Sequence, residues 1–436
     1  MSAQFVNRLT KKILPDVLYR RLISDWDKDG FKKYFNNTGW IFSARMVTFI
    51  TSFITVIYVG RYLGPDGLGK ISYAQSLIAI FSMFASLGID HIVFRDLVAH
   101  PENEGKILGT AIVTKLFFGV LTFIATVITA LSLHNEPLLT WLVSIIALSF
   151  IFQPLGVVGH VFNARVLSKY TTIVSLIIAF LIPLLKFIVI WTDQGVLYFA
   201  IIVAFEAFIS SILYIILYTA ILHGKLRSLS VSWLTFKQMT HDSWPIMLVG
   251  ATGYLYARID QVMIQHFIDS SSVGFYEVAV RLTEPLGFFP GVIIGSLFPA
   301  LVNARRDNLA EYKKRFRSLV MLCLGISTTL ASLIYLLAPY LVGTIYGPDF
   351  MPSITILRIY VWSNVGTVAT LLMYNYFIAE NRMYLQLMYT ALGAVMNILL
   401  NLIMIPALGI TGAAYATLIT VIVVVGTFLI TRRWVS

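Results

Sequence analysis

The sequence predicts an all-α, multi-pass membrane protein with about twelve transmembrane helices. Of its 436 residues, 58% are hydrophobic and only 12% are charged, whereas soluble globular domains carry about 25% charged residues. The apolar residues form runs long enough to cross a hydrocarbon core about 30 Å thick at about 1.5 Å per helical residue. Backbone groups in lipid have no water to bind, so such runs must be helical. The single cysteine, Cys323, excludes a disulfide framework.

Twelve apolar runs are separated by short polar segments, at residues 38–60, 71–89, 107–133, 138–161, 171–191, 195–222, 244–267, 273–300, 318–338, 353–378, 384–406 and 409–431. Short cytoplasmic loops retain Lys and Arg, so the distribution of these residues indicates orientation. With both termini placed in the cytoplasm, 24 of the 32 basic residues lie on the cytoplasmic side, two lie outside and six lie within the runs. This bias favours an even helix count with both termini cytoplasmic.

Twelve helices suggest two six-helix lobes. A shift of 205 residues superposes Gly69 on Gly274, at the start of the second helix of each half. Because six is an even number, each half begins and ends on the cytoplasmic side, and the two halves are parallel repeats. Such a pair encloses a cavity suited to alternating access. The expected parts are a basic amphipathic cytoplasmic tail (1–36), an N-terminal lobe (37–222), a cytoplasmic linker (223–243) and a C-terminal lobe (244–436).

Soluble catalytic functions are disfavoured. Residues 64–70 nearly match a phosphate-binding loop, but Ile71 occupies the position where Ser or Thr would hold magnesium. A turn between two helices explains the Gly and Pro of this segment. The net charge of +11 is scattered between apolar blocks, which argues against a nucleic-acid partner. We expect no cofactor, no metal and no catalytic residue.

Four arginines lie within predicted helices: Arg45, Arg258, Arg281 and Arg358. A charge at the bilayer centre costs about 2.5–3.5 kcal/mol, so such residues usually face a partner or a wet cavity. Arg45 shares its helix face with Thr48, Ser52 and Thr55. Arg258, near the middle of the seventh helix, shares its face with Tyr254, Gln261 and Gln265. Arginines in both halves would attract an anion into a central cavity, and guanidinium groups suit phosphate.

The embedded acids are candidates for ion coupling. Glu206 lies near the middle of the sixth helix without a charged partner on that helix, which suits a proton carrier. Asp260 points away from the arginine on its own helix and must pair with another helix or be protonated. Glu277, Arg281 and Glu284 form a stripe that can neutralise itself. A structural polar network between helices is the alternative for all of these residues.

Three segments carry a family resemblance. Residues 60–74 read GRYLGPDGLGKISYA and are followed by LGI at 87–89, residues 346–350 read YGPDF, and residues 405–417 read IPALGITGAAYAT. They resemble the O-antigen (Wzx-type) translocases, the polysaccharide-unit flippases of the multidrug/oligosaccharidyl-lipid/polysaccharide exporter superfamily. The resemblance covers essentially the whole chain after the tail.

The resemblance implies a V-shaped pair of lobes in the bacterial inner membrane. Such a protein would move an undecaprenyl-diphosphate-linked oligosaccharide from the cytoplasmic to the periplasmic leaflet, as a transporter rather than an enzyme, in O-antigen or lipopolysaccharide biosynthesis. Its expected partners are this lipid-diphosphate-linked oligosaccharide, membrane lipids and other polysaccharide assembly proteins.

Depth and facing then suggest roles for the embedded residues. We expect the diphosphate or an acidic sugar to contact Arg45, Arg258 and Arg281, and the sugar to face Tyr254, Gln261 and Gln265. Ion coupling would involve Glu206, Asp260, Glu277 or Glu284. Two alternatives stay open. A drug/cation antiporter of the same superfamily would need an acidic surplus in its cavity, and a membrane glycan polymerase would need a sizeable external loop.

Overall fold

A computed structural model describes residues 28–133, 136–224 and 226–435. Its α-helices are α3 (Lys28–Ser86), α4 (Ile89–Ala99), α5 (Glu104–Leu133), α6 (Pro137–Ala147), α7 (Ser149–Phe152), α8 (Gly159–Ala164), α9 (Ser168–Trp191), α10 (Val196–Ile221), α11 (Trp233–Phe267), α12 (Ser270–Asp307), α13 (Leu309–Ile345), α14 (Ser353–Ala379), α15 (Met383–Leu408) and α16 (Ile410–Val435). Short 3₁₀ turns are η1 (Pro101–Asn103), η2 (Gln153–Val158), η3 (Leu226–Ser228) and η4 (Pro348–Phe350). The predicted all-α class is confirmed.

Ten segments of the described chain are long and apolar enough to cross a membrane. One of them, Ser43–Ser86, contains two crossings, because Gly64 takes φ 66° and ψ −177° and reverses the chain within α3. Glycine suits this position since its φ is positive. The 35-residue α11 is not among the ten, because Arg258, Asp260 and its glutamines lower its hydropathy. Counting both crossings of α3 together with α11 gives the expected twelve.

Several boundaries differ from those expected. The second crossing begins at Pro65 rather than residue 71, because a proline is well tolerated in the first turn of a helix. The expected fourth helix is divided into α6, α7, η2 and α8, since Pro154 interrupts the run. The expected linker 223–243 is helical from Trp233, where the Ser232 side chain caps α11 by accepting a hydrogen bond from the Thr235 N–H. The expected tail lies outside the described residues up to residue 27, and residues 28–36 belong to α3.

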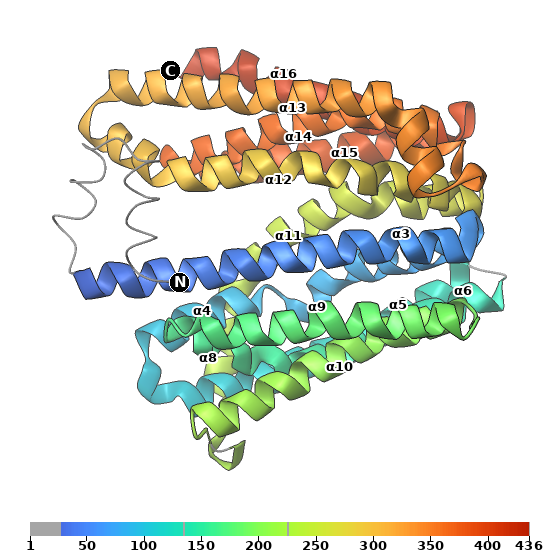
Figure 1. Cartoon of the computed structure of the whole chain (residues 1–436). Helices are drawn as coiled ribbons and strands as arrows, with labels where there is room; N and C mark the ends of the chain where they lie inside the picture. Colours follow the sequence, from blue (N-terminus) through green and yellow to red (C-terminus); the bar gives the residue numbers. More distant parts are fainter. Residues whose placement is uncertain (1–27, 134–135, 225, 436) are drawn as a thin grey trace.

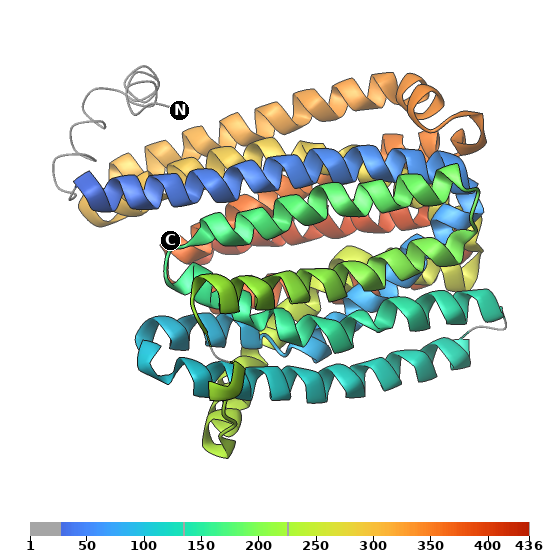
Figure 2. The same cartoon turned by 60° about the horizontal axis from the view of Figure 1, so that its bottom comes forward.

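The helices form two bundles, which we call the first bundle (α3 to α10) and the C-terminal bundle (α11 to α16). Helices α3 and α11 lie where the two bundles meet (Figure 1). Helix α3 packs against α5, α6 and α9 of its own bundle and also against α12 of the other bundle. The start of α3 and the end of α16 lie at the same end of the molecule, which we call the terminus end. Figure 2 shows the helices from a second direction, with α13 (orange) and α5 (teal) on opposite edges and α3 (blue) beside α9. The lobe boundaries 37–222 and 244–436 stay predictions.

The two bundles touch backbone to backbone at the end opposite the termini. A Cβ added to Gly69 of α3 would lie 1.7 Å from the carbonyl oxygen of Ser270, and one added to Gly274 of α12 would lie 2.1 Å from that of Pro65. The shift of 205 residues converts Pro65 to Ser270 and Gly69 to Gly274, so the two contacts are reciprocal. Such reciprocity is typical of an interface around a two-fold axis. We call these four residues the glycine contact.

Helices α11 and α12 have open space beside several glycines nearer the terminus end. Five glycines there have nothing within 4 Å of a Cβ added to them: Gly250 and Gly253 on α11, and Gly287, Gly291 and Gly295 on α12. The bundles therefore approach most closely at the end opposite the termini.

Candidate functional site

A polar cluster joins the two bundles close to the glycine contact. Gln261 of α11 accepts a hydrogen bond from the Ser76 hydroxyl of α3 and donates one to Oε2 of Glu277 on α12 at 2.5 Å. The other carboxylate oxygen of Glu277 accepts from Nε of Arg281 at 2.6 Å. Arg281 also pairs with Glu284 at 3.0 Å. We call these five residues the interface cluster.

The interface cluster leaves Arg281 without a free positive charge. Its guanidinium is shared by two carboxylates, and the Glu277 side chain is only 2% exposed. The structure therefore shows the pairing of Arg281 with Glu277 and Glu284 that their spacing predicts. Glu284, whose side chain is 35% exposed, is the more accessible of the two acids.

Two charges of the first bundle lie near this cluster. Lys186 of α9 lies within electrostatic range of both Glu206 of α10 and Arg281 of α12. Glu206 therefore has a cationic neighbour on an adjacent helix, which its own helix did not reveal. Spacing along one helix does not reveal this role for Lys186, because a lysine near a helix end can also extend to the membrane surface.

A second network is buried within the C-terminal bundle. Asp260 of α11, only 4% exposed, accepts hydrogen bonds from Tyr276 at 2.5 Å, from Thr417 at 2.6 Å and from Asn401 at 2.6 Å. The Asn401 amide also donates to Asn397 at 3.1 Å. The partners of Asp260 lie on α12, α15 and α16, in keeping with its orientation away from Arg258. We call these five residues the Asp260 network.

The Asp260 network contains no positively charged side chain. Its four other members are neutral, and the Oδ1 atom of Asn401 is buried without a hydrogen-bond partner. Sequence reasoning missed these partners. Asn397 and Asn401, spaced i and i+4 in an apolar run, were the available signal, because that spacing places two amides on one helix face.

Arg258 and Arg45 have no ion pair with any described carboxylate. Arg258 is half-buried, and Tyr360 of α14 lies within electrostatic range of both Arg258 and Glu284. Arg45 is exposed and lies on α3, which is helical from Lys28. Phe49, one turn further, stacks on Phe288 of α12 at 5.4 Å, so this part of α3 also faces the other bundle.

The three residues expected to face sugar are separated in the structure. Tyr254 is 47% exposed, on the uncovered half of α11. Gln261 belongs to the interface cluster and is buried. Gln265 borders a cavity of about 510 Å³ between the bundles near Glu136, and its Oε1 has no hydrogen-bond partner. Tyr254 is therefore the only one of the three that is exposed.

A third charged group lies nearer the terminus end. One oxygen of Asp90 on α4 accepts a hydrogen bond from Lys115 at 2.7 Å and contacts Nε2 of His160 at 3.0 Å. Burial alone would raise the pKa of the Asp90 carboxyl, but the hydrogen bond with His160 and the charge of Lys115 outweigh it and hold this pKa well below its ordinary value. The group links three helices of the first bundle.

Curated relatives and this chain share much of their length. The chain is 23% identical over 372 residues to the "Probable low-salt glycan biosynthesis flippase Agl15" of Haloferax volcanii, which covers 84% of this chain and 76% of the relative. It is 21% identical over 321 residues to the "Capsular polysaccharide biosynthesis protein CapF" of Staphylococcus aureus, covering 72% of this chain and 78% of the relative.

Solved structures share the fold. A structure of the lipid II flippase MurJ in an inward closed conformation matches with a TM-score of 0.71 at 16% identity, covering 92% of this chain and 87% of that one. An inward-facing multidrug resistance MATE family transporter of the MOP superfamily matches with a TM-score of 0.68 at 16% identity, covering 88% and 94%. The pattern of the family described as polysaccharide biosynthesis protein matches residues 34–305, more than half of the chain. The chain therefore belongs to the polysaccharide biosynthesis protein family.

Proposed function

We propose that this protein is a flippase that moves an undecaprenyl-diphosphate-linked oligosaccharide repeat unit across the bacterial inner membrane by alternating access. The names of its relatives, a glycan biosynthesis flippase and a capsular polysaccharide biosynthesis protein, support a lipid-linked glycan as the substrate. The protein acts as a transporter and carries out no covalent step. O-antigen and lipopolysaccharide assembly are the pathways we expect, with other polysaccharide assembly proteins as partners.

Arg258 is the observation that carries this proposal. It lies near the middle of the apolar run 244–267 within α11 and has no ion pair with a described carboxylate. A guanidinium at that depth is costly unless an anion compensates it, and its planar fork matches a phosphate. Arg281, by contrast, is already neutralised by two carboxylates. We therefore assign the diphosphate to Arg258, with Arg45 as a second contact for the headgroup.

The conformation fits the first half of a transport cycle. The glycine contact closes one end of the bundle interface. Toward the terminus end, Tyr254 is exposed and the five glycines of α11 and α12 have open space beside them. With the termini in the cytoplasm, this is a state that receives substrate from the cytoplasmic leaflet. Gln261 then stabilises the closed end of the interface, because its hydrogen bonds with Ser76 and Glu277 hold α3, α11 and α12 together.

Asp260 is the preferred coupling residue. Glu277 and Glu284 pair with Arg281, and Glu206 lies near Lys186, so each of these acids has a cationic neighbour. The described neighbours of Asp260 are neutral hydroxyl and amide groups. A carboxylate enclosed in this way needs a proton or a small cation to be neutral. Binding and release of that ion would change the packing of α11 against α12, α15 and α16.

The test is Arg258→Ala in cells that depend on this protein for surface glycan. We expect lipid-linked single repeat units to accumulate on the cytoplasmic face, with partial export in Arg258→Lys. Arg358→Ala is the matched control, because Arg358 lies over the Tyr335 ring at 5.4 Å within one bundle. Accumulation on the periplasmic face would instead indicate a polymerase. Unchanged glycan with altered drug sensitivity would indicate an antiporter.

A further inference from the structure

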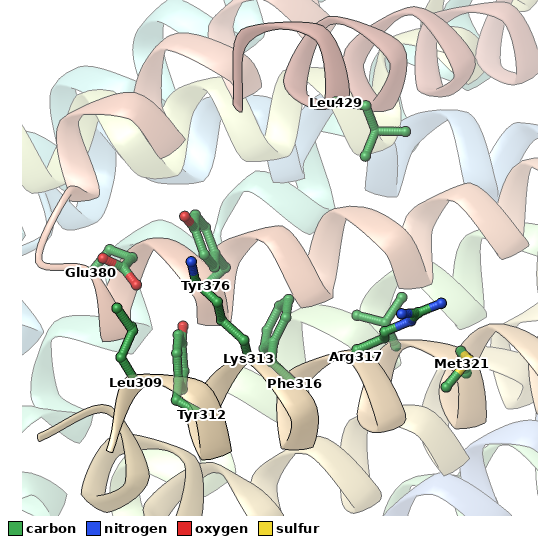
Figure 3. Close-up of a pocket in the computed structure, with 10 residues that line it drawn as sticks. Leu309, Tyr312, Lys313, Phe316, Arg317, Met321, Tyr376, Glu380 and Leu429 are labelled. Atoms are coloured by element: carbon green, nitrogen blue, oxygen red, sulfur yellow. The ribbon is translucent and has the colours of Figure 1, made fainter. Parts of the chain in front are cut away.

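A groove of about 810 Å³ lies on the surface of the C-terminal bundle (Figure 3). Its floor is the end of α14, at Tyr376 and Glu380, and its walls are the start of α13 and the end of α16. The helix α14 packs against both walls and separates them. The volume is within the range of about 300–1,000 Å³ that proteins use for small ligands.

The groove lies away from the interface between the bundles. That interface is formed by α3 with α11 and α12, whereas the groove is bordered by α13, α14 and α16. It extends along α13 from Leu309 to Met321, which is about 18 Å at 1.5 Å per residue. It therefore begins at the terminus end and reaches roughly through one leaflet of a bilayer about 30 Å thick.

The middle of the groove is basic. Lys313 and Arg317 are exposed, lie one helical turn apart on α13 and project into the groove (Figure 3). Neither has an ion pair with a described carboxylate. Glu380, the acid that lines the groove, is already held by Arg305 through two contacts of 3.0 Å. The groove therefore presents two uncompensated positive charges.

One end of the groove is apolar. Val320, Met321 and Leu429 line it, and Met321 and Leu429 are 58% and 55% exposed. These side chains lie deeper along α13 and α16 than Lys313. A basic middle section followed by an apolar end matches an amphiphile with an anionic head and a hydrocarbon tail.

We propose that this groove binds one anionic phospholipid from the leaflet at the terminus end. Its phosphate lies between Lys313 and Arg317, and one acyl chain lies against Val320, Met321 and Leu429. A lipid-linked glycan fits less well, because the described groove lining offers no free amide or carboxylate for a sugar chain. The groove floor at Tyr376 also lies 16 residues along α14 from Tyr360, the residue near Arg258. The bound lipid connects α13 to α16, which α14 otherwise separates.

The experiment uses the full-length protein purified in a neutral detergent. Native mass spectrometry measures binding of phosphatidylglycerol and of phosphatidylcholine, and thermal unfolding is recorded in parallel. We expect phosphatidylglycerol to bind preferentially and raise the melting temperature. Replacing Lys313 and Arg317 together with Ala should weaken its binding about 30-fold, at roughly fivefold per basic residue near a membrane surface.

Matched variants separate a built site from general surface charge. Lys314→Ala combined with Arg315→Ala removes two basic side chains from the same helix outside the groove lining, one of which pairs with Glu311 at 2.7 Å, and should leave binding unchanged. Leu429→Trp fills the apolar end without changing charge, and should weaken binding. Equal loss in the two double variants, or no effect of Leu429→Trp, would overturn the proposal. So would displacement of the lipid by inorganic phosphate, or preferential binding of a polyprenyl phosphate.

Discussion

The glycine contact predicts that Gly274→Ala opens the end of the interface opposite the termini. The added Cβ would lie 2.1 Å from the carbonyl oxygen of Pro65, whereas ordinary contact begins at 3.4 Å. The new Cβ is fixed to the backbone of α12 and the carbonyl oxygen belongs to the backbone of α3, so no side-chain rotation can relieve the overlap. The helices must separate by about 1.3 Å at Gly274, and by about 1.7 Å in Gly69→Ala, where the starting distance is 1.7 Å.

The cost of this overlap applies to the closed arrangement only. Inserting a methyl group into a packed interface costs about 1–3 kcal/mol. When the bundles separate, the methyl group meets open space and the cost disappears. The equilibrium should therefore shift toward separation by roughly 5–150-fold. Alanine also favours helix over glycine by about 0.8–1.0 kcal/mol, but equally in both arrangements, so this effect cancels.

Spin labels on opposite bundles measure the shift. Trp191→Cys and Tyr340→Cys place labels at positions that are 88% and 67% exposed, after the buried Cys323 is replaced by Ser. Double electron–electron resonance in nanodiscs should show longer distances in Gly274→Ala. Gly287→Ala is the control on the same helix, because its Cβ would meet nothing within 4 Å. Unchanged distances in a folded Gly274→Ala protein would refute the reasoning.

Three further outcomes are expected. Asp260→Asn should leave the protein folded but make glycan export independent of proton and sodium gradients, measured with ionophores. Asp90→Asn should lower the free energy of unfolding by about 1 kcal/mol at neutral pH, because Lys115 loses its carboxylate while solvent screens the partly exposed pair. Since the pKa of Asp90 is lowered, that stabilisation is present above about pH 4 and lost on acidification, so unfolding of the two proteins should converge at low pH. Gln261→Leu should cost about 1–3 kcal/mol in thermal unfolding, because Glu277 loses a buried donor.

The membrane fold was predictable because lipid imposes one strong rule on the backbone. Long apolar runs must be helices, so most of the expected spans reappear. The errors lie where polar residues continue a helix beyond the lipid. Trp233 begins α11 well before the apolar run at 244, since Ser232 caps it. Pro65 begins the second crossing because a single positive-φ glycine, Gly64, is enough to reverse the chain.

The candidate site was predictable only along single helices. The pairing of Arg281 with Glu277 and Glu284 follows from spacing, because residues three and four apart share a face. The neighbours of Asp260 required the packing of four helices, which periodicity does not specify. Gln261 shows the limit most clearly. It shares a face with Arg258 in the sequence, yet its amide is occupied by Ser76 and Glu277 at the closed interface.

The two halves share a backbone contact but differ in chemistry. Under the shift of 205 residues, the charged positions of the second half correspond to neutral ones in the first: Asp260 to Thr55, Glu277 to Ser72 and Arg281 to Ser76. The glycine contact is reciprocal, so both bundles contribute equivalent residues to it. Groups that respond to an ion or a headgroup are concentrated on α11 and α12. An ion that alters the hydrogen bonds of Gln261 would therefore act on residues of the C-terminal bundle alone. Because the glycine contact holds both bundles, such a local change in charge can separate the two bundles as rigid bodies.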